Sequence, residues 1–255
     1  MDLGLNGRRA LVGGGGSGIG AGIATALAAE GARVALIGRT ADRVEGEAAK
    51  LGGTAVVADL STPDGAATAV DAAVAALGGL DLVLVNTGGP ATGTIDSMTD
   101  AEWATAVDGT LYAVLRLIRA ALPPLREGND PAILIVLSSS VREPIPGLTA
   151  SNVLRPGLAG LIKSSVAELA PVRINGIAPG RIATDRIAYL DGRRAEAAGV
   201  TAEEIGRRTM ATIPLGRYGE VDEIGRVGAF LLSPAASYVT GAIVPVDGGM
   251  IRSLP

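Results

Sequence analysis

The sequence contains no cysteine and no histidine, and each absence removes a kind of chemistry. Without cysteine the chain forms no disulfide and has no thiolate nucleophile. Without histidine it lacks the commonest metal ligand, together with every catalytic triad or general base that depends on imidazole. We therefore expect no metal site, and several classes of enzyme are excluded.

Aromatic side chains and concentrated positive charge are also scarce. Aromatic residues make up 2% of the chain, and the formal net charge is -4 with no run rich in lysine and arginine. This charge argues against a nucleic acid or an anionic membrane surface as a partner. The first residues do not pair a basic segment with an apolar one, and no uninterrupted apolar stretch reaches membrane-spanning length. We expect a cytoplasmic protein that acts on a small molecule.

Glycine and aliphatic residues dominate the composition. The 255 residues are 48% hydrophobic and include 37 glycines, which suits a folded domain with closely packed aliphatic layers. Short aliphatic runs, typical of buried parallel strands, alternate with Ala-rich stretches that have helical spacing. The runs are residues 9–12, 33–37, 55–58, 80–85, 132–137, 173–177 and 242–246, and two clear helical stretches are 19–30 and 64–77.

This alternation predicts an α/β fold with a doubly wound parallel sheet of the Rossmann type and helices on both faces, because parallel strands need crossover connections. No linker, repeat or low-complexity segment interrupts it, so residues 1–255 are expected to form a single domain. Residues 185–212 are polar and rich in arginine and glutamate, and we expect them to project as a helical flap over the site.

A glycine-rich turn, residues 13–20, follows the first predicted strand and leads directly into a predicted helix. Its sequence is Gly-Gly-Gly-Gly-Ser-Gly-Ile-Gly. Glycine has no Cβ and adopts positive φ, so the backbone can approach a diphosphate whose charge is met by N–H groups at the helix N-terminus. A glycine-rich loop alone is weak support, but the strand before it and the helix after it indicate a phosphate-binding turn.

The spacing Gly14-x-x-x-Gly18-x-Gly20 resembles that of the short-chain dehydrogenase/reductase family, although Gly13 stands where the family usually has threonine. The resemblance continues at 59–60 (Asp-Leu), 86–89 (Asn-Thr-Gly-Gly), 173–180, Thr184, 214–217, 239–241 and 247–249. It implies a nicotinamide dinucleotide as cofactor. The cofactor-binding residues that it implies are Gly14, Gly16, Ser17, Gly18, Ile19, Gly20, Arg39, Asp59, Leu60, Asn86, Gly88, Arg155, Pro179, Gly180, Ile182 and Thr184.

The end of the second predicted strand bears on the choice between NAD and NADP. A carboxylate there would hydrogen-bond the ribose 2′-hydroxyl of NAD and repel a 2′-phosphate. The sequence has Gly38 followed by Arg39 instead, and a guanidinium can pair with a phosphate bidentately. NADP is therefore expected in preference to NAD, the alternative being that Arg39 is a solvated surface residue.

The catalytic positions depart from the family pattern, in which a Tyr-x-x-x-Lys pair, an upstream serine and a helix asparagine serve the reaction. Ser151 stands for the tyrosine, Arg155 for the lysine and Asp108 for the asparagine. The upstream serine is kept as one of Ser138, Ser139 and Ser140: strand register favours Ser139, and ungapped counting from position 151 favours Ser138. The Ser-Asn-x-x-Arg segment resembles that of a divergent branch similar to 3-oxoacyl-(acyl carrier protein) reductases.

These replacements change the available chemistry. A lysine lowers the pKa of the family's tyrosine from near 10, whereas a serine hydroxyl is far less acidic and ends roughly 4 Å short of a phenol. Arg155 can hold ribose hydroxyls and supply positive charge, but it does not give up a proton at neutral pH. Asp108 is expected either to handle a proton or to be an ordinary solvated or capping carboxylate. Pro156 is expected to delay the start of the helix after Thr149, leaving Ser151 on a loop or as a cap.

Three functions are compatible with this pattern. The first is an NAD(P)-dependent oxidoreductase, a ketone or 3-oxoacyl reductase with altered proton chemistry, in which Ser139 or Ser138 holds the carbonyl oxygen. The second is a lyase, isomerase or cyclase that uses the site without redox chemistry, and the third is a nucleotide-binding protein without turnover. The apolar stretches 111–122 and 158–169 correspond to the helices through which the family forms tetramers or dimers, so a homo-oligomer is expected.

Overall fold

Seven parallel strands form the centre of the protein, in the order β3-β2-β1-β4-β5-β6-β7. The computed structural model describes residues 2–253. The strands are β1 (Arg9–Val12), β2 (Arg33–Gly38), β3 (Thr54–Val57), β4 (Leu82–Val85), β5 (Ala132–Val136), β6 (Arg173–Pro179) and β7 (Ile243–Val246). Each was predicted to within two residues, because parallel strands covered on both faces are continuous aliphatic runs. The predicted doubly wound sheet is confirmed.

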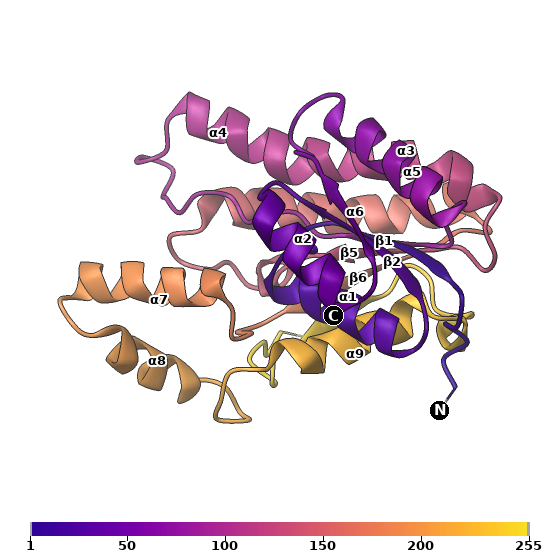
Figure 1. Ribbon diagram of the computed structural model, residues 1–255. Coiled ribbons are helices and arrows are strands. Elements are labelled where there is room, and N and C mark those ends of the chain that lie inside the picture. Colours follow the sequence, from indigo (N-terminus) through magenta and orange to yellow (C-terminus); the bar gives the residue numbers. More distant parts are fainter. Residues whose placement is uncertain (1, 254–255) are drawn as a thin grey trace.

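Helices cover the sheet on both faces (Figure 1). On one face the buried side chains of α3 (Gly65–Leu77), α5 (Ala113–Arg126) and α6 (Thr149–Leu169) pack on the strands. On the other face the buried side chains of three further helices pack on the strands: α1 (Gly18–Ala29), α2 (Ala41–Lys50) and α9 (Val221–Leu232). The described residues thus form one domain with two hydrophobic layers, and no helix among them is long and apolar enough to cross a bilayer.

The strand order places a crevice at the carboxyl ends of the central strands. From β1 the chain moves outward through β2 to β3, and it then returns to form β4 on the other side of β1. In such sheets the loops after β1 and β4 diverge, and ligands bind at this switch point beside the carboxyl ends of the strands. The glycine turn follows β1 and Asn86 follows β4, so both predicted motifs lie at the crevice.

The start of α6 differs from the prediction. The helix begins at Thr149 and continues through Pro156, so Ser151 lies in its first turn and not on a loop or at a cap. Pro156 is exposed, while Leu154 and Leu158 on the inner face are buried in the core. Burial of that face outweighs the one backbone hydrogen bond that proline removes, because packing provides most of a helix's stability in a protein.

The polar segment 185–212 contains two helices, α7 (Asp185–Ala198) and α8 (Ala202–Met210). Figure 1 shows this orange pair projecting away from the two helical layers. One buried cluster ties the pair to the body: the Tyr218 hydroxyl donates to Asp191 Oδ2 at 2.6 Å, and Arg181 Nη1 lies 3.6 Å from Asp191 Oδ1. The predicted helical character of this segment is confirmed.

Candidate active site

A cleft of about 1480 Å³ runs along the carboxyl ends of the strands. Its walls come from the loops after β1, β2, β3, β4, β5 and β6, with α7 and α8 at the outer side. Every predicted cofactor-binding and catalytic residue lines this cleft except Gly20 and Asp108. Residues up to 170 positions apart in the sequence, Gly14 and Thr184, therefore meet in one space, as a shared site requires.

The glycine turn has the geometry that a diphosphate needs. Gly14 and Gly18 have φ values of +61° and +55°, which favour glycine. A Cβ on Gly14 would lie 2.6 Å from Asn86 Nδ2, so the turn is closed against the end of β4. The Ser17 side chain makes no capping hydrogen bond at the start of α1, so the first N–H groups of that helix remain available to a ligand.

Gly20 was predicted to bind the cofactor, and its position contradicts this. It is buried inside α1 and does not line the cleft. A Cβ at Gly20 would lie 2.1 Å from the Gly14 carbonyl oxygen. The third glycine of the motif therefore permits close packing of the helix against the turn, outside the wall of the cleft.

The far end of the cleft combines an acidic and a basic residue. Asp59 accepts hydrogen bonds from the Ser61 backbone N–H at 2.9 Å and from the Ser61 hydroxyl at 2.7 Å. These bonds, with a smaller contribution from the charge of Arg39, lower the Asp59 pKa below its ordinary value, so its carboxylate stays ionised. Arg39 is exposed at the rim, and nearby Arg43 lies 3.5 Å from Asp185 of α7. The rim can thus receive a phosphate from solvent.

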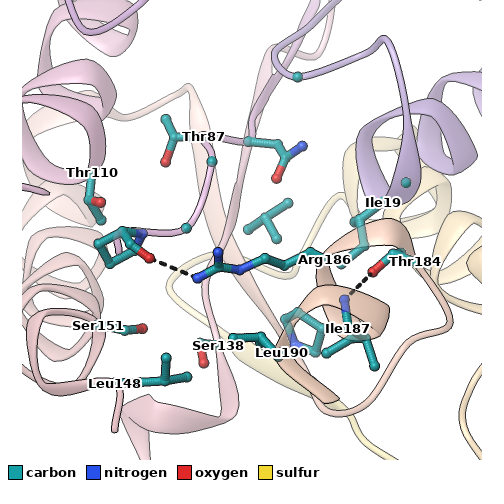
Figure 2. Close-up of a pocket in the computed structure, with 18 of the residues that line it drawn as sticks. Ile19, Thr87, Thr110, Ser138, Leu148, Ser151, Thr184, Arg186, Ile187 and Leu190 are labelled. Carbon is teal, nitrogen blue, oxygen red and sulfur yellow. Dashed lines mark hydrogen bonds between the residues drawn. The ribbon is translucent and has the colours of Figure 1, made fainter. Parts of the chain in front are cut away.

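Serine hydroxyls line the wall that was predicted to be catalytic. Ser138, Ser139 and Ser151 all border the cleft, and Figure 2 shows Ser138 and Ser151 beside Thr110 on that side. The Ser138 hydroxyl accepts a hydrogen bond from the Ser140 backbone N–H at 3.1 Å. Ser140, the third candidate for the upstream serine, does not line the cleft, and its hydroxyl oxygen lies 3.3 Å from that of Ser151. The two favoured candidates, Ser138 and Ser139, both line the cleft, and Ser139 is the more buried of the two.

Arg155 is a buried cation without an acidic partner among residues 2–253. Only 5% of its surface is exposed, and its guanidinium donates to the Val136 carbonyl oxygen. Burial, with a smaller contribution from the charge of Arg186, lowers the Arg155 pKa to about 10. Its Nε and the Thr87 hydroxyl oxygen are buried without a hydrogen-bond partner among residues 2–253. Buried polar atoms normally have partners, so these two indicate that a polar ligand belongs in the cleft.

Asp108 lies outside the cleft, which contradicts its predicted place at the site. Its carboxylate is 3.2 Å from the Arg116 guanidinium and is 48% exposed. The chain forms a π-helical turn here, Val107–Tyr112, and this extra residue per turn directs Gly109 and Thr110 into the cleft instead. Thr110 is 1% exposed and is a site residue that sequence reasoning missed.

Arg186 is the other residue that sequence reasoning missed. Thr184 caps α7 by accepting a hydrogen bond from the Ile187 N–H at 3.4 Å, and this places Arg186 in the first turn of the helix. From there its side chain extends across the middle of the cleft and donates to the Pro90 carbonyl oxygen at 2.7 Å (Figure 2). Its place two residues after the Thr184 of the family motif was the only available signal. No group of acidic side chains in the described chain is arranged to hold a metal ion.

The sequence and the structure resemble those of known proteins. Residues 14–251 match the model of a family described as enoyl-(acyl carrier protein) reductase. Nodulation protein G of Rhizobium sp. (strain N33) is 34% identical over 250 residues, covering 96% of this chain and 98% of that protein. The L-sorbose reductase of Gluconobacter frateurii, solved with NADPH and L-sorbose, has a TM-score of 0.93 and 29% identity over 100% of both chains. An NADPH-bound short-chain oxidoreductase of Pseudomonas aeruginosa PAO1, described as containing an atypical catalytic center, has a TM-score of 0.86 and 31% identity over 96% of this chain and 97% of that one.

Proposed function

Because the chain belongs to the short-chain dehydrogenase/reductase family of NAD(P)-dependent oxidoreductases, we propose that it is an NADP-dependent carbonyl reductase with altered proton chemistry. The observation that carries this proposal is the meeting, in one cleft, of the glycine turn with the serine wall and Arg155. A reductase needs both parts of this cleft, since the glycine turn would bind the cofactor and the serine wall would hold the oxygen of the carbonyl group that is reduced.

The residues of the cleft fit a nicotinamide dinucleotide. Gly14 and Gly18 leave room for a diphosphate against the backbone, and the buried Arg155 Nε and Thr87 hydroxyl suit the hydroxyls of a ribose. Arg39 at the rim favours a 2′-phosphate, hence NADP. When bound, the nicotinamide supplies the hydride; the remaining roles fall to side chains of this chain. NADPH was bound in two of the similar structures, which supports the same preference.

The serine wall would hold the carbonyl oxygen. The Ser138 hydroxyl oxygen accepts from the Ser140 N–H, so its own proton is free to point at a substrate oxygen. Ser139 is the alternative, although it is more buried. Arg155 would supply positive charge that stabilises the developing alkoxide, and it would not give up its own proton at neutral pH. Since Ser151 is far less acidic than a phenol, the proton would come from water or from the substrate.

The missing phenol and lysine also favour a second candidate function. With Ser151 and Arg155 at these positions, the site could bind the dinucleotide and catalyse a lyase, isomerase or cyclase reaction, or none. One sequence of measurements separates these functions. Purified protein would be titrated with NADPH while the fluorescence is followed, and it would then be offered a panel of carbonyl compounds while the nicotinamide absorbance is monitored. Binding with turnover supports the reductase, binding without turnover supports the alternative, and absence of binding contradicts both.

Assembly and location remain predictions that accompany this function. We propose that the protein forms a homo-oligomer, a tetramer or a dimer, through contacts between α5 and α6 of different copies. We also propose that it is located in the cytoplasm. The outer surface of α6 suits close contact between copies, since a Cβ at Gly157 or Gly160 would meet no other atom within 4 Å.

A further inference from the structure

Arg186 is a second cation in the cleft that has no acidic partner. It lies between two walls: Ile19 and Thr184 stand on one side of it, and Ser138 and Ser151 on the other (Figure 2). Among residues 2–253, no carboxylate lies within 4 Å of its guanidinium, and its recorded hydrogen bond goes to the neutral Pro90 carbonyl. A guanidinium has five N–H donors, so most of them remain for a ligand.

The electrostatics around Arg186 are unfavourable without a ligand. Burial lowers the pKa of Arg186, and the charge of Arg186 in turn contributes to the lowered pKa of Arg155. The two guanidinium groups therefore repel one another in a partly desolvated space. Burying like charges together costs free energy unless a counter-charge is present.

The acidic side chains of the cleft are engaged elsewhere. Asp59 accepts hydrogen bonds from Ser61, and Asp185 pairs with Arg43. Glu102 closes the capping box of α4 (Asp100–Ala106), and Glu143 accepts hydrogen bonds from the backbone N–H groups of residues 252 and 253. Among residues 2–253, none of these carboxylates lies within 4 Å of the Arg186 guanidinium. A molecule that enters the cleft can supply the negative charge.

The surroundings define what kind of anion fits. Leu148, Ile187 and Leu190 are apolar side chains near Arg186 in the same view (Figure 2). The serines that would hold a carbonyl oxygen face it across the cleft. An oxo acid meets these conditions, with its carboxylate on Arg186, its carbonyl at the serine wall and its tail on the apolar side chains.

We propose that the substrate is a 2-oxo or 3-oxo acid with an apolar tail, and that Arg186 is the residue that binds its carboxylate. This inference rests on the proposed carbonyl reductase function. Arg186 determines specificity through a charge-assisted, bidentate pair with the carboxylate, and the charge of Arg155 adds to the positive potential of the cleft. The diphosphate of the cofactor is the other anion that could reach Arg186, so the test must separate the two.

Two matched pairs of probes test the inference: benzoylformate with its methyl ester, and 3-oxohexanoate with its methyl ester. Each is titrated calorimetrically into protein saturated with NADP⁺. We expect each acid to bind about tenfold or more tightly than its ester, as a charge-assisted hydrogen bond provides. Arg186→Gln should remove this difference by weakening acid binding about 10- to 100-fold, while the dissociation constant for NADPH stays within about twofold of the wild-type value.

Arg193→Gln is the matched control, because Arg193 is on the same helix but pairs with Glu196 outside the cleft. It should leave both acid and NADPH binding unchanged. Equal binding of acid and ester by the wild-type protein overturns the inference, and so does an Arg186→Gln variant that loses NADPH binding as strongly as acid binding. Reduction of neutral carbonyls without preference for acids would overturn the inference alone, whereas absence of NADPH binding would overturn the proposed function.

Discussion

At the scale of single residues, we predict that Arg39 determines the preference for NADP over NAD. It lines the rim of the cleft, is exposed, and follows Gly38 at the end of β2. Replacing Arg39 with aspartate puts a carboxylate where a 2′-phosphate would bind and where a ribose 2′-hydroxyl could donate. We expect NADPH affinity to fall by about 10- to 100-fold, the value of a charged hydrogen bond, and NADH affinity to rise relative to it. Fluorescence titration with both nucleotides measures this.

The matched control for that substitution is Arg119→Asp. Arg119 is exposed on α5 and does not line the cleft, so the variant carries the same change of net charge. Its affinities for NADPH and NADH should equal those of the wild type. Equal loss in both variants would mean that Arg39 acts only through the overall charge of the protein.

A second prediction at this scale concerns the missing acid. Ser151 is 7% exposed and borders the cleft, so a tyrosine there would extend toward the substrate space. The double variant Ser151→Tyr, Arg155→Lys should reduce a neutral ketone with a kcat about 10²- to 10⁴-fold above wild type, the usual contribution of a positioned general acid. The corresponding Ser151→Phe, Arg155→Lys variant lacks only the hydroxyl and should gain nothing. A double variant that binds NADPH normally but shows no gain over its phenylalanine counterpart would contradict this account of the site.

Single residues differ in how well the sequence predicts them. The positions of Gly14, Ser138 and Arg155 follow from a motif with fixed spacing, and all three line the cleft as predicted. The prediction that Asp108 lies at the site failed because a π-helical turn changes which residue of this segment faces the cleft. Such a turn leaves no clear mark in the sequence. Arg186 was missed because it is one of several arginines in a polar segment that carries no motif. Its proposed role depends on its position in the folded protein, opposite the serine wall and close enough to Arg155 to affect its pKa.

At the scale of the elements, Asp81 connects the beginnings of β1 and β4. Its carboxylate accepts from Arg9 Nη2 at 2.8 Å, Arg9 Nε at 3.0 Å and the Asn129 N–H at 2.8 Å. The Asp81 side chain is 4% exposed and that of Arg9 is 25% exposed. Asp81→Asn leaves Arg9 without its counter-charge, so the free energy of unfolding should fall by about 2–3 kcal/mol, less than for a fully buried pair. Urea denaturation measures the change.

The pH dependence of that loss follows from the Asp81 pKa. Burial alone raises this pKa, but the hydrogen bonds from Arg9 and Asn129 outweigh it and hold the pKa below its ordinary value. A carboxyl with a lowered folded-state pKa stabilises the fold above its unfolded value, near 4, and loses that contribution as pH falls through the folded value. The gap between wild type and Asp81→Asn should therefore be full at neutral pH and shrink in acid. Asp130→Asn, which removes a 57% exposed carboxylate paired with Arg8, should change stability by less than about 1 kcal/mol at any pH. A gap that does not change with pH would contradict this role of Asp81.

The positions of the strands could be predicted where burial on both faces requires a continuous run of aliphatic residues. Strands β4 and β5 matched because helices cover both of their faces, so each consists of buried aliphatic residues without interruption. The start of α6 was not predictable in this way. Pro156 suggests a break, but the energy that keeps the helix continuous comes from tertiary packing of Leu154 and Leu158, which local sequence does not display.

At the scale of the whole molecule, strand order and the glycine turn together fix where a ligand can bind. The alternation of strands and helices predicted the sheet, and the handedness of crossover connections leaves few orders for its strands. The crevice between the loops after β1 and β4 follows from that order. The position of α7 and α8 over the cleft does not, since their contact with the body depends on single bonds such as that between Tyr218 and Asp191.

The most direct test of the central claim, that the glycine turn binds a nicotinamide dinucleotide, is calorimetric titration of the protein with NADPH. We predict saturable binding to the wild type and affinity about tenfold or more weaker in Gly18→Ala, because a φ of +55° strains an alanine in the turn whose N–H groups would make charged hydrogen bonds to a diphosphate. Gly52→Ala carries a comparable strain, at a φ of +61°, outside the cleft and should bind NADPH like the wild type. A wild-type protein that gives no heat with NADPH or NADH would contradict the account.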